Sequence, residues 1–214
     1  RRAASEAVER AVAAGQRWGG VPPRDRATAL ERAADALEAA RTQLVEVMAA
    51  EAGKTIDQGD PEVSEVVDFA RYYAQSAREL EAMVGARPVP RKVTLVTPPW
   101  NFPVAIPGGS TLAALAAGSA VILKPAPATR RCAAVLADVL WASGIPRDVL
   151  QLVDCEEDPV GSALVRDDRV YQIILTGAYE TAELFTRLRP GARLLAETSG
   201  KNAMIVTPSA DLDL

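Results

Sequence analysis

The stretch "KVTLVTPPWNFPVAIPGGSTLAALAAGSAVILK", residues 92–124, decides the fold. It joins two short β-branched runs, at 92–97 and 119–124, through a helical window at 109–118. Parallel strands need a long crossover connection, and strands that alternate with helices of about ten residues are typical of βαβ units. The stretch therefore predicts the first part of a parallel sheet.

The same alternation continues toward the C-terminus. Right-handed crossovers between such strands put helices on both faces of the sheet. We therefore predict an α/β fold with a mainly parallel sheet of about five strands between 91 and 206. The further strand candidates are 149–153, 170–177, 192–197 and 202–206, and the helical windows between them are 128–144, 158–167 and 178–188.

The residues before Arg91 read as helical. In 24–54, apolar residues recur at spacings of three, four or seven, which makes one apolar stripe, and Gly53 ends the helix. Asp60 and Pro61 open a second amphipathic helix, which Pro88 stops. We expect these helices to pack against the sheet. Residues 1–20 form another amphipathic helix rather than a signal peptide, because charges interrupt their apolar residues.

Composition limits the chemistry. The 214 residues carry a net charge of −4 and include two cysteines and no histidine. The absence of histidine excludes Ser-His-Asp and Cys-His catalysis, and two lone cysteines indicate a reducing cytoplasm without a metal site. We expect no affinity for nucleic acid, and no membrane span, since no apolar run reaches about 18 residues.

Polar residues stand where four of the predicted strands end. An open parallel sheet binds ligands at the carboxyl ends of its strands, so the topology brings these segments together. They carry Asn101, Lys124, Thr176 with Gly177, and Glu197. The segments are "TPPWNFP" (97–103), "LKPAPAT" (123–129), "LTGA" (175–178) and "AETSGK" (196–201).

Each of these residues also has a structural explanation. Asn101 could bond its own turn, and Lys124 could be a strand-end side chain that reaches solvent along its aliphatic stem. Thr176 and Gly177 could form an ordinary turn, and Glu197 could cap a loop. The chain contains neither G-x-G-x-x-G nor G-x-x-x-x-G-K-[ST], the two common nucleotide-binding motifs.

Taken together, the segments resemble the NAD(P)-dependent aldehyde dehydrogenase superfamily. The resemblance rests on "TPPWNFPVAIPGG", "AVILKPAPAT", "IILTGA" and "AETSGKNAMIV" in this order, and extends to "EAGKT" at 51–55. Within the superfamily, "VDFARYYAQSAREL" and "LQLVDCEEDPVG" are similar to L-glutamate γ-semialdehyde (1-pyrroline-5-carboxylate) dehydrogenase, in the form fused to proline dehydrogenase.

The resemblance implies how the chain is organised. Residues 91–214 would be an NAD(P)-binding, Rossmann-like domain, and residues 1–90 a helical segment packed on it. The nucleophilic cysteine and the catalytic domain that carries it would lie beyond Leu214, so this chain alone should be inactive. The whole enzyme would act on a small aldehyde and form a homo-oligomer.

The resemblance also implies residue roles. Asn101 would donate to the aldehyde oxygen as it becomes an oxyanion, with the adjacent prolines and aromatic rings excluding water, and Glu197 would activate the water that hydrolyses a thioester. Lys124 would contact the adenosine ribose of NAD, or the 2′-phosphate if NADP is used. The other cofactor-binding candidates are Thr97, Pro98, Trp100, Gly161, Thr176, Gly177, Ala178, Thr198 and Ser199.

Two positions depart from the pattern of many relatives. Pro127 stands where a glutamate binds the ribose, and Ala178 stands where a serine binds phosphate, so we expect weak cofactor binding.

Neither cysteine is expected to act as the nucleophile. Cys132 lies in the middle of a predicted helix, and acidic neighbours should raise the thiol pKa of Cys155.

Two other functions stay open from the sequence. The enzyme could oxidise a different small aldehyde. A chain that naturally ended near Leu214 would instead be a non-catalytic nucleotide-binding or assembly module.

Overall fold

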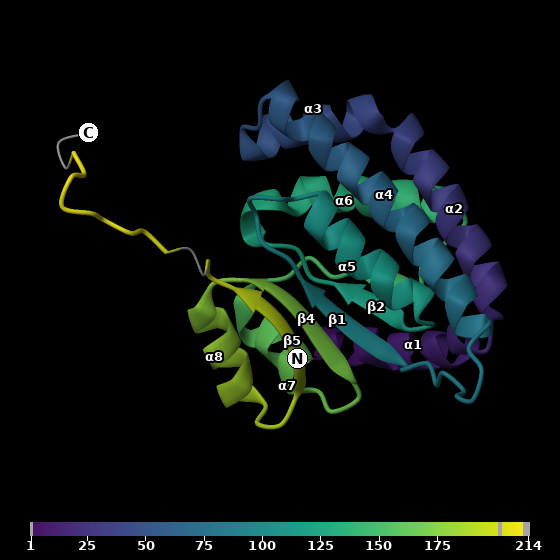
Figure 1. The fold of residues 1–214 in the computed structure, drawn as a ribbon. Helices are drawn as coiled ribbons and strands as arrows, with labels where there is room; N and C mark the ends of the chain where they lie inside the picture. The colour runs from purple at the N-terminus through teal and green to yellow at the C-terminus, as the bar shows by residue number, and fades with distance from the viewer. Residues whose placement is uncertain (1, 201–202, 212–214) are drawn as a thin grey trace.

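A computed structural model describes residues 2–200 and 203–211 and contains a five-stranded parallel sheet (Figure 1). The strand order is β3-β2-β1-β4-β5, and every neighbouring pair is parallel. The predicted α/β fold is confirmed. The strands are β1 (Val93–Thr97), β2 (Ala120–Leu123), β3 (Leu150–Leu152), β4 (Gln172–Gly177) and β5 (Arg193–Thr198).

The order of the strands reverses at β1, in the centre of the sheet. β1 pairs with β2 on one side, with Thr94 opposite Val121, and with β4 on the other, with Thr97 opposite Leu175. All residues of β1 and β2 are buried, which fits their continuous apolar runs, because parallel strands are covered on both faces.

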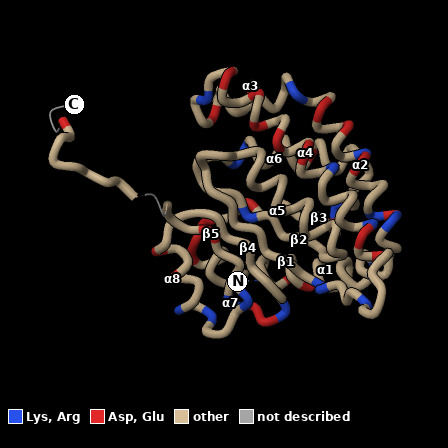
Figure 2. Tube along the Cα trace, in the orientation of Figure 1, with Lys and Arg blue, Asp and Glu red and all other residues tan. Residues whose placement is uncertain are grey.

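Helices cover both faces of the sheet. In Figure 1, α2 to α6 lie on one face, whereas α1, α7 and α8 lie on the other. Acidic and basic residues are interspersed along α2 and α3 (Figure 2). The helices are α1 (Arg2–Gly19), α2 (Pro23–Ala39), α3 (Arg41–Ala52), α4 (Ile56–Glu81), α5 (Ala105–Ala116), α6 (Arg130–Ala142), α7 (Ser162–Arg166) and α8 (Tyr179–Leu188).

The N-terminal helices share one hydrophobic core with the sheet. α1 contacts β1, β2 and β3, and α4 packs on α5. Among the described residues, one core cluster contains buried side chains from both sides of Arg91. None of the helices in the described ranges combines the length and apolarity that crossing a lipid bilayer requires.

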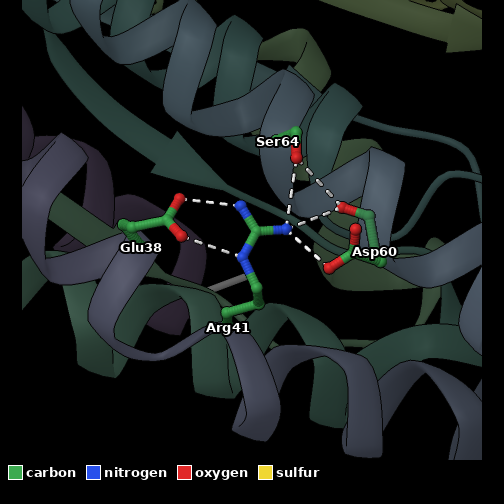
Figure 3. Close-up of polar contacts among 4 residues, drawn as sticks. All are labelled: Glu38, Arg41, Asp60 and Ser64. Carbon is green, nitrogen blue, oxygen red and sulfur yellow. Dashed lines mark hydrogen bonds and ion pairs between the residues drawn. The ribbon is translucent and has the colours of Figure 1, made fainter.

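The single helix predicted over 24–54 is wrong, because the chain turns at Ala40 between α2 and α3. The Arg41 guanidinium fixes this turn, as Figure 3 shows. It donates to both carboxylate oxygens of Glu38, at 2.9 and 2.7 Å, and reaches Asp60 at 2.7 Å and Ser64 at 3.1 Å in α4. The apolar stripe is therefore divided between two helices that α4 holds together.

The start predicted for the next helix is also wrong. α4 begins at Ile56, and Pro61 lies inside it rather than at its first turn. Thr55 and Gln58 provide the earlier start, since the Thr55 N–H donates to the Gln58 side chain at 3.4 Å.

The sixth candidate strand, 202–206, is not confirmed. Residues 203–206 form no strand, and Asn202 lies outside the described residues. Met204 and Ile205 are 91% and 87% exposed. Figure 1 shows this segment extending away from the sheet, so its apolar residues have no surface of the described chain to pack on.

Candidate active site

A cleft of about 810 Å³ opens at the carboxyl edge of the sheet, beside the reversal between β1 and β4. Such a reversal is where open α/β sheets bind ligands. The cleft brings together all but one of the predicted site residues. They are Thr97, Pro98, Trp100, Asn101, Lys124, Gly161, Thr176, Gly177, Ala178, Glu197 and Ser199.

Thr198 is the predicted residue that does not line the cleft. It lies between Glu197 and Ser199, which both do. Successive side chains of a strand point to opposite faces, and Thr198 is the β5 residue that follows Glu197.

The floor of the cleft is formed where β1 and β4 end. Thr97 is the last residue of β1 and is 7% exposed, and its hydroxyl donates to the Ile174 carbonyl at 3.2 Å. Thr176 and Gly177 end β4, two residues before α8 begins, so they lie close to the helix start but outside it.

Lys124 lines the cleft, and its side chain lies beside Gly161. The backbone N–H of Lys124 donates to the Val96 carbonyl at 3.0 Å, which continues the pairing of β2 with β1. The side-chain Nζ donates to the Pro125 carbonyl at 3.4 Å. A Cβ at Gly161 would lie 3.0 Å from the Cε of Lys124. Glycine therefore leaves room for this side chain, which is the single cation among the described residues that line the cleft.

Asn101 lies in an open turn, not in the enclosed corner that the sequence predicts. Asn101 is exposed, and Trp100 and Phe102 are 59% and 44% exposed, because no described element covers this turn. The Asn101 carboxamide makes no hydrogen bond with any residue that the structure describes. It therefore does not bond its own turn there, and both of its polar atoms are available to a ligand.

Glu197 is likewise available. It lies in β5, the edge strand of the sheet, and is exposed. Across residues 2–200 and 203–211, its carboxylate has no ion-pair or hydrogen-bond partner. Glu197 thus does not act as a loop cap in the described structure, and its carboxylate can accept a proton from a molecule in the cleft.

The apolar wall of the cleft was not predicted. It is formed by α8, whose residues Thr181, Leu184, Phe185 and Leu188 line the cleft. Their spacing marks one face of a helix, which could have revealed them. Ala178 is the N-cap of α8 and provides no side-chain acceptor, so first-turn N–H groups can bind an anion.

Neither cysteine lines the cleft. Cys132 is buried in the first turn of α6, not in the middle of the helix as predicted, and burial together with Glu51 raises its pKa. Burial is also the largest cause that raises the pKa of Cys155. Asp154 adds to this effect, whereas Lys124 opposes it, so acidic neighbours are only a secondary cause.

Known proteins resemble this chain over nearly its whole length. The aldehyde dehydrogenase family model matches residues 1–214. Bifunctional protein PutA of Escherichia coli (strain K12) is 42% identical over 217 residues, which cover 98% of this chain and 16% of that protein. 1-Pyrroline-5-carboxylate dehydrogenase 2 of Bacillus subtilis (strain 168) is 33% identical over 232 residues, which cover 99% of this chain and 44% of that protein.

A solved structure of Proline Utilization A (PutA) from Corynebacterium freiburgense matches with a TM-score of 0.86 and 49% identity. The match covers 97% of this chain and 22% of that one. The chain therefore spans less than half the length of each of these relatives.

Proposed function

Because this chain belongs to the aldehyde dehydrogenase family, we propose that its cleft binds NAD⁺ and an aldehyde for oxidation of the aldehyde to a carboxylic acid. One observation carries the proposal. The Asn101 carboxamide and the Glu197 carboxylate, neither with a partner in the described structure, line one cleft together with Lys124.

L-Glutamate γ-semialdehyde is the proposed substrate, with L-glutamate as the product. The names of the matched relatives, a bifunctional PutA protein and a 1-pyrroline-5-carboxylate dehydrogenase, support this choice. On the same basis we propose that the whole protein serves proline catabolism together with a proline dehydrogenase domain. Within this chain, residues 91–214 would be the nucleotide-binding domain, on which residues 1–90 pack.

The cleft fits a dinucleotide on three grounds. It lies at the strand reversal, the start of α8 offers N–H groups without a side-chain cap, and Lys124 presents an ammonium group. Lys124 would bind the ribose, and the N–H groups of α8 would lie near the pyrophosphate. NAD⁺ supplies the hydride acceptor when bound.

The charges in the cleft favour NAD⁺ over NADP⁺. Glu157 and Asp158 line it, and Lys124 is the cation of the described lining. A 2′-phosphate would bring further negative charge beside these two carboxylates. Pro127 also lines the cleft, and it offers no carboxylate to the ribose hydroxyls.

In the proposed reaction, Asn101 and Glu197 act at different stages. Attack of a thiolate on the aldehyde carbonyl would form a C–S bond and move the electron pair of the C=O π bond onto the oxygen, and the Asn101 NH₂ group would donate to this oxyanion. Glu197 would later take a proton from the water that releases the acid. The thiol must come from outside this cleft, because neither Cys132 nor Cys155 lines it.

The proposal is tested on the native protein that contains this chain. Isothermal titration with NAD⁺ and with NADP⁺ measures cofactor binding, and NADH absorbance with glutamate γ-semialdehyde measures oxidation. We expect tighter binding of NAD⁺, and NADH formation that depends on the semialdehyde. Binding without oxidation of any small aldehyde would instead support a non-catalytic nucleotide-binding module, and oxidation of other aldehydes alone would exclude the proposed substrate.

A further inference from the structure

A buried glutamate from α4 caps the start of α5. Glu62 has a side chain that is 1% exposed. Its Oε1 accepts the N–H groups of Val104 at 2.8 Å and Ala105 at 3.0 Å, 42 and 43 residues further along the chain. Val104 is the N-cap of α5 and has no side-chain oxygen of its own. Glu62 thus satisfies donors that the helix start leaves unpaired, and its charge suits the positive end of the helix.

Lys54 connects this carboxylate to the Asn101 turn. Its side chain is 12% exposed, and its ammonium group forms an ion pair with Oε2 of Glu62. The same Nζ lies 4.3 Å from the centroid of the Phe102 ring, within the range of a cation–π interaction. One partly buried ion pair therefore contacts both the Phe102 ring and the backbone of Val104 and Ala105, which follow Asn101.

Two glycines in α5 allow Glu62 to come this close. A Cβ at Gly108 would lie 2.3 Å from a methyl carbon of Val66, and a Cβ at Gly109 would lie 2.7 Å from the ring of Phe69. Both partners belong to α4. The small residues thus set the separation of α4 and α5 at which a carboxylate on one helix reaches the first N–H groups of the other.

We propose that Glu62 and Lys54 are positioning residues that hold the turn of residues 100–104 and so direct the Asn101 carboxamide into the cleft. The inference rests on the proposed function, because Asn101 must have a role in order to be positioned. Within residues 2–200 and 203–211, Asn101 has no hydrogen bond of its own. In the described part of the chain, the polar and cation–π contacts that other segments make to residues 99–105 come from Glu62 and Lys54.

The first measurement is hydrogen exchange in the native protein that contains this chain. Lys54→Met removes the cation and keeps a long side chain, so the Val104 and Ala105 amides should exchange faster. Arg41→Met is the matched control. Arg41 ties α3 to Asp60 of α4 (Figure 3). Its hydrogen bonds go to Glu38, Asp60 and Ser64, outside residues 100–104. Exchange at Val104 and Ala105 should stay unchanged in this control, and equal acceleration in both variants would contradict the proposal.

The second measurement is a double-mutant cycle on the first turnover of hydride transfer. Lys54→Met should slow this step by about tenfold to a hundredfold, the cost of a misplaced catalytic group, with NAD⁺ affinity unchanged. In an Asn101→Ala background it should cause no further loss, because groups that act through one another are non-additive. Lys54→Arg should retain most of the rate. If Lys54→Met does not fold, Glu62→Gln takes its place in the cycle.

The outcomes separate the two proposals. Multiplicative losses for Lys54→Met and Asn101→Ala would overturn the positioning role and leave the proposed function intact. A normal first turnover in Asn101→Ala would also overturn the positioning role, because the turn would then hold no catalytic group. The proposed function would fail differently, through the absence of aldehyde-dependent NADH formation in the unaltered protein.

Discussion

The Thr97 hydroxyl at the end of β1 donates to the Ile174 carbonyl of β4 at 3.2 Å, and so ties the two strands on either side of the reversal. Thr97→Val keeps the shape and removes the bond. We expect a loss of about 0.5–1.5 kcal/mol in the free energy of unfolding. Urea denaturation measures it, and Thr97→Ser, which keeps the hydroxyl, is the control. Equal loss in both variants would assign the effect to packing.

Removal of the ammonium group of Lys124 should weaken NAD⁺ binding. We expect Lys124→Met to raise Kd by about tenfold to a hundredfold, as for loss of one charge-assisted hydrogen bond. Isothermal titration gives the value. Arg130→Met is the control, because Arg130 pairs with Asp154 and Glu156 and does not line the cleft. An unchanged Kd in Lys124→Met would remove Lys124 from the site.

Loss of the Asn101 carboxamide should slow the first turnover of NADH formation. Asn101→Ala removes one donor to the developing oxyanion, which is worth about 10²–10³ in rate. Stopped-flow NADH absorbance measures the burst, and calorimetric NAD⁺ affinity, which should not change, shows whether the cleft is intact. A burst at the normal rate would show that Asn101 has no such role.

Glu197→Gln should affect a later step. The amide cannot take a proton from water, so we expect a retained first-turnover burst of NADH followed by slow steady-state release of the acid. The same stopped-flow trace reports both phases. A burst that is slowed as much as the steady state would place Glu197 before hydride transfer, where it would activate the thiol.

Asp167 makes the fold sensitive to acid. Its side chain accepts three hydrogen bonds from Arg169, and these hold the pKa of Asp167 below its usual value. A lowered folded-state pKa stabilises the fold above the unfolded value of about 3.9, and this stabilisation is lost as pH falls through the folded value. Asp167→Asn should therefore reduce the free energy of unfolding at neutral pH more than in acid, as measured by urea denaturation at both. An equal loss at both would show that charge is not involved.

The sheet could be predicted from sequence because each strand is a short apolar run that can be recognised without knowing its neighbours in space. The β-branched runs that became β1 and β2 need both faces covered, and their spacing leaves room for one crossover helix. The carboxyl ends of parallel strands lie at one edge of the sheet. Lys124, Glu197 and the Asn101 turn stand at such ends, and this is why they line one cleft.

The remaining features depend on contacts between distant residues. Ala40 is a good helix former, so the break between α2 and α3 has no local signal, and it is fixed instead by the contacts of Arg41 with α4. The hydrogen bond from the Val104 N–H to the Glu62 carboxylate likewise has no signal in the local sequence. The exposure of Asn101 could not be predicted either, because apolar neighbours indicate burial only when another element covers them.

The central place of β1 has a consequence for synthesis of the chain. On a ribosome, β2 follows β1 after a single helix, α5, but Gln172 of β4, the partner of Thr94, is added 78 residues after Thr94. One edge of β1 is therefore exposed to the cell while α6, β3 and α7 are translated. The two walls of the cleft are therefore completed at different times.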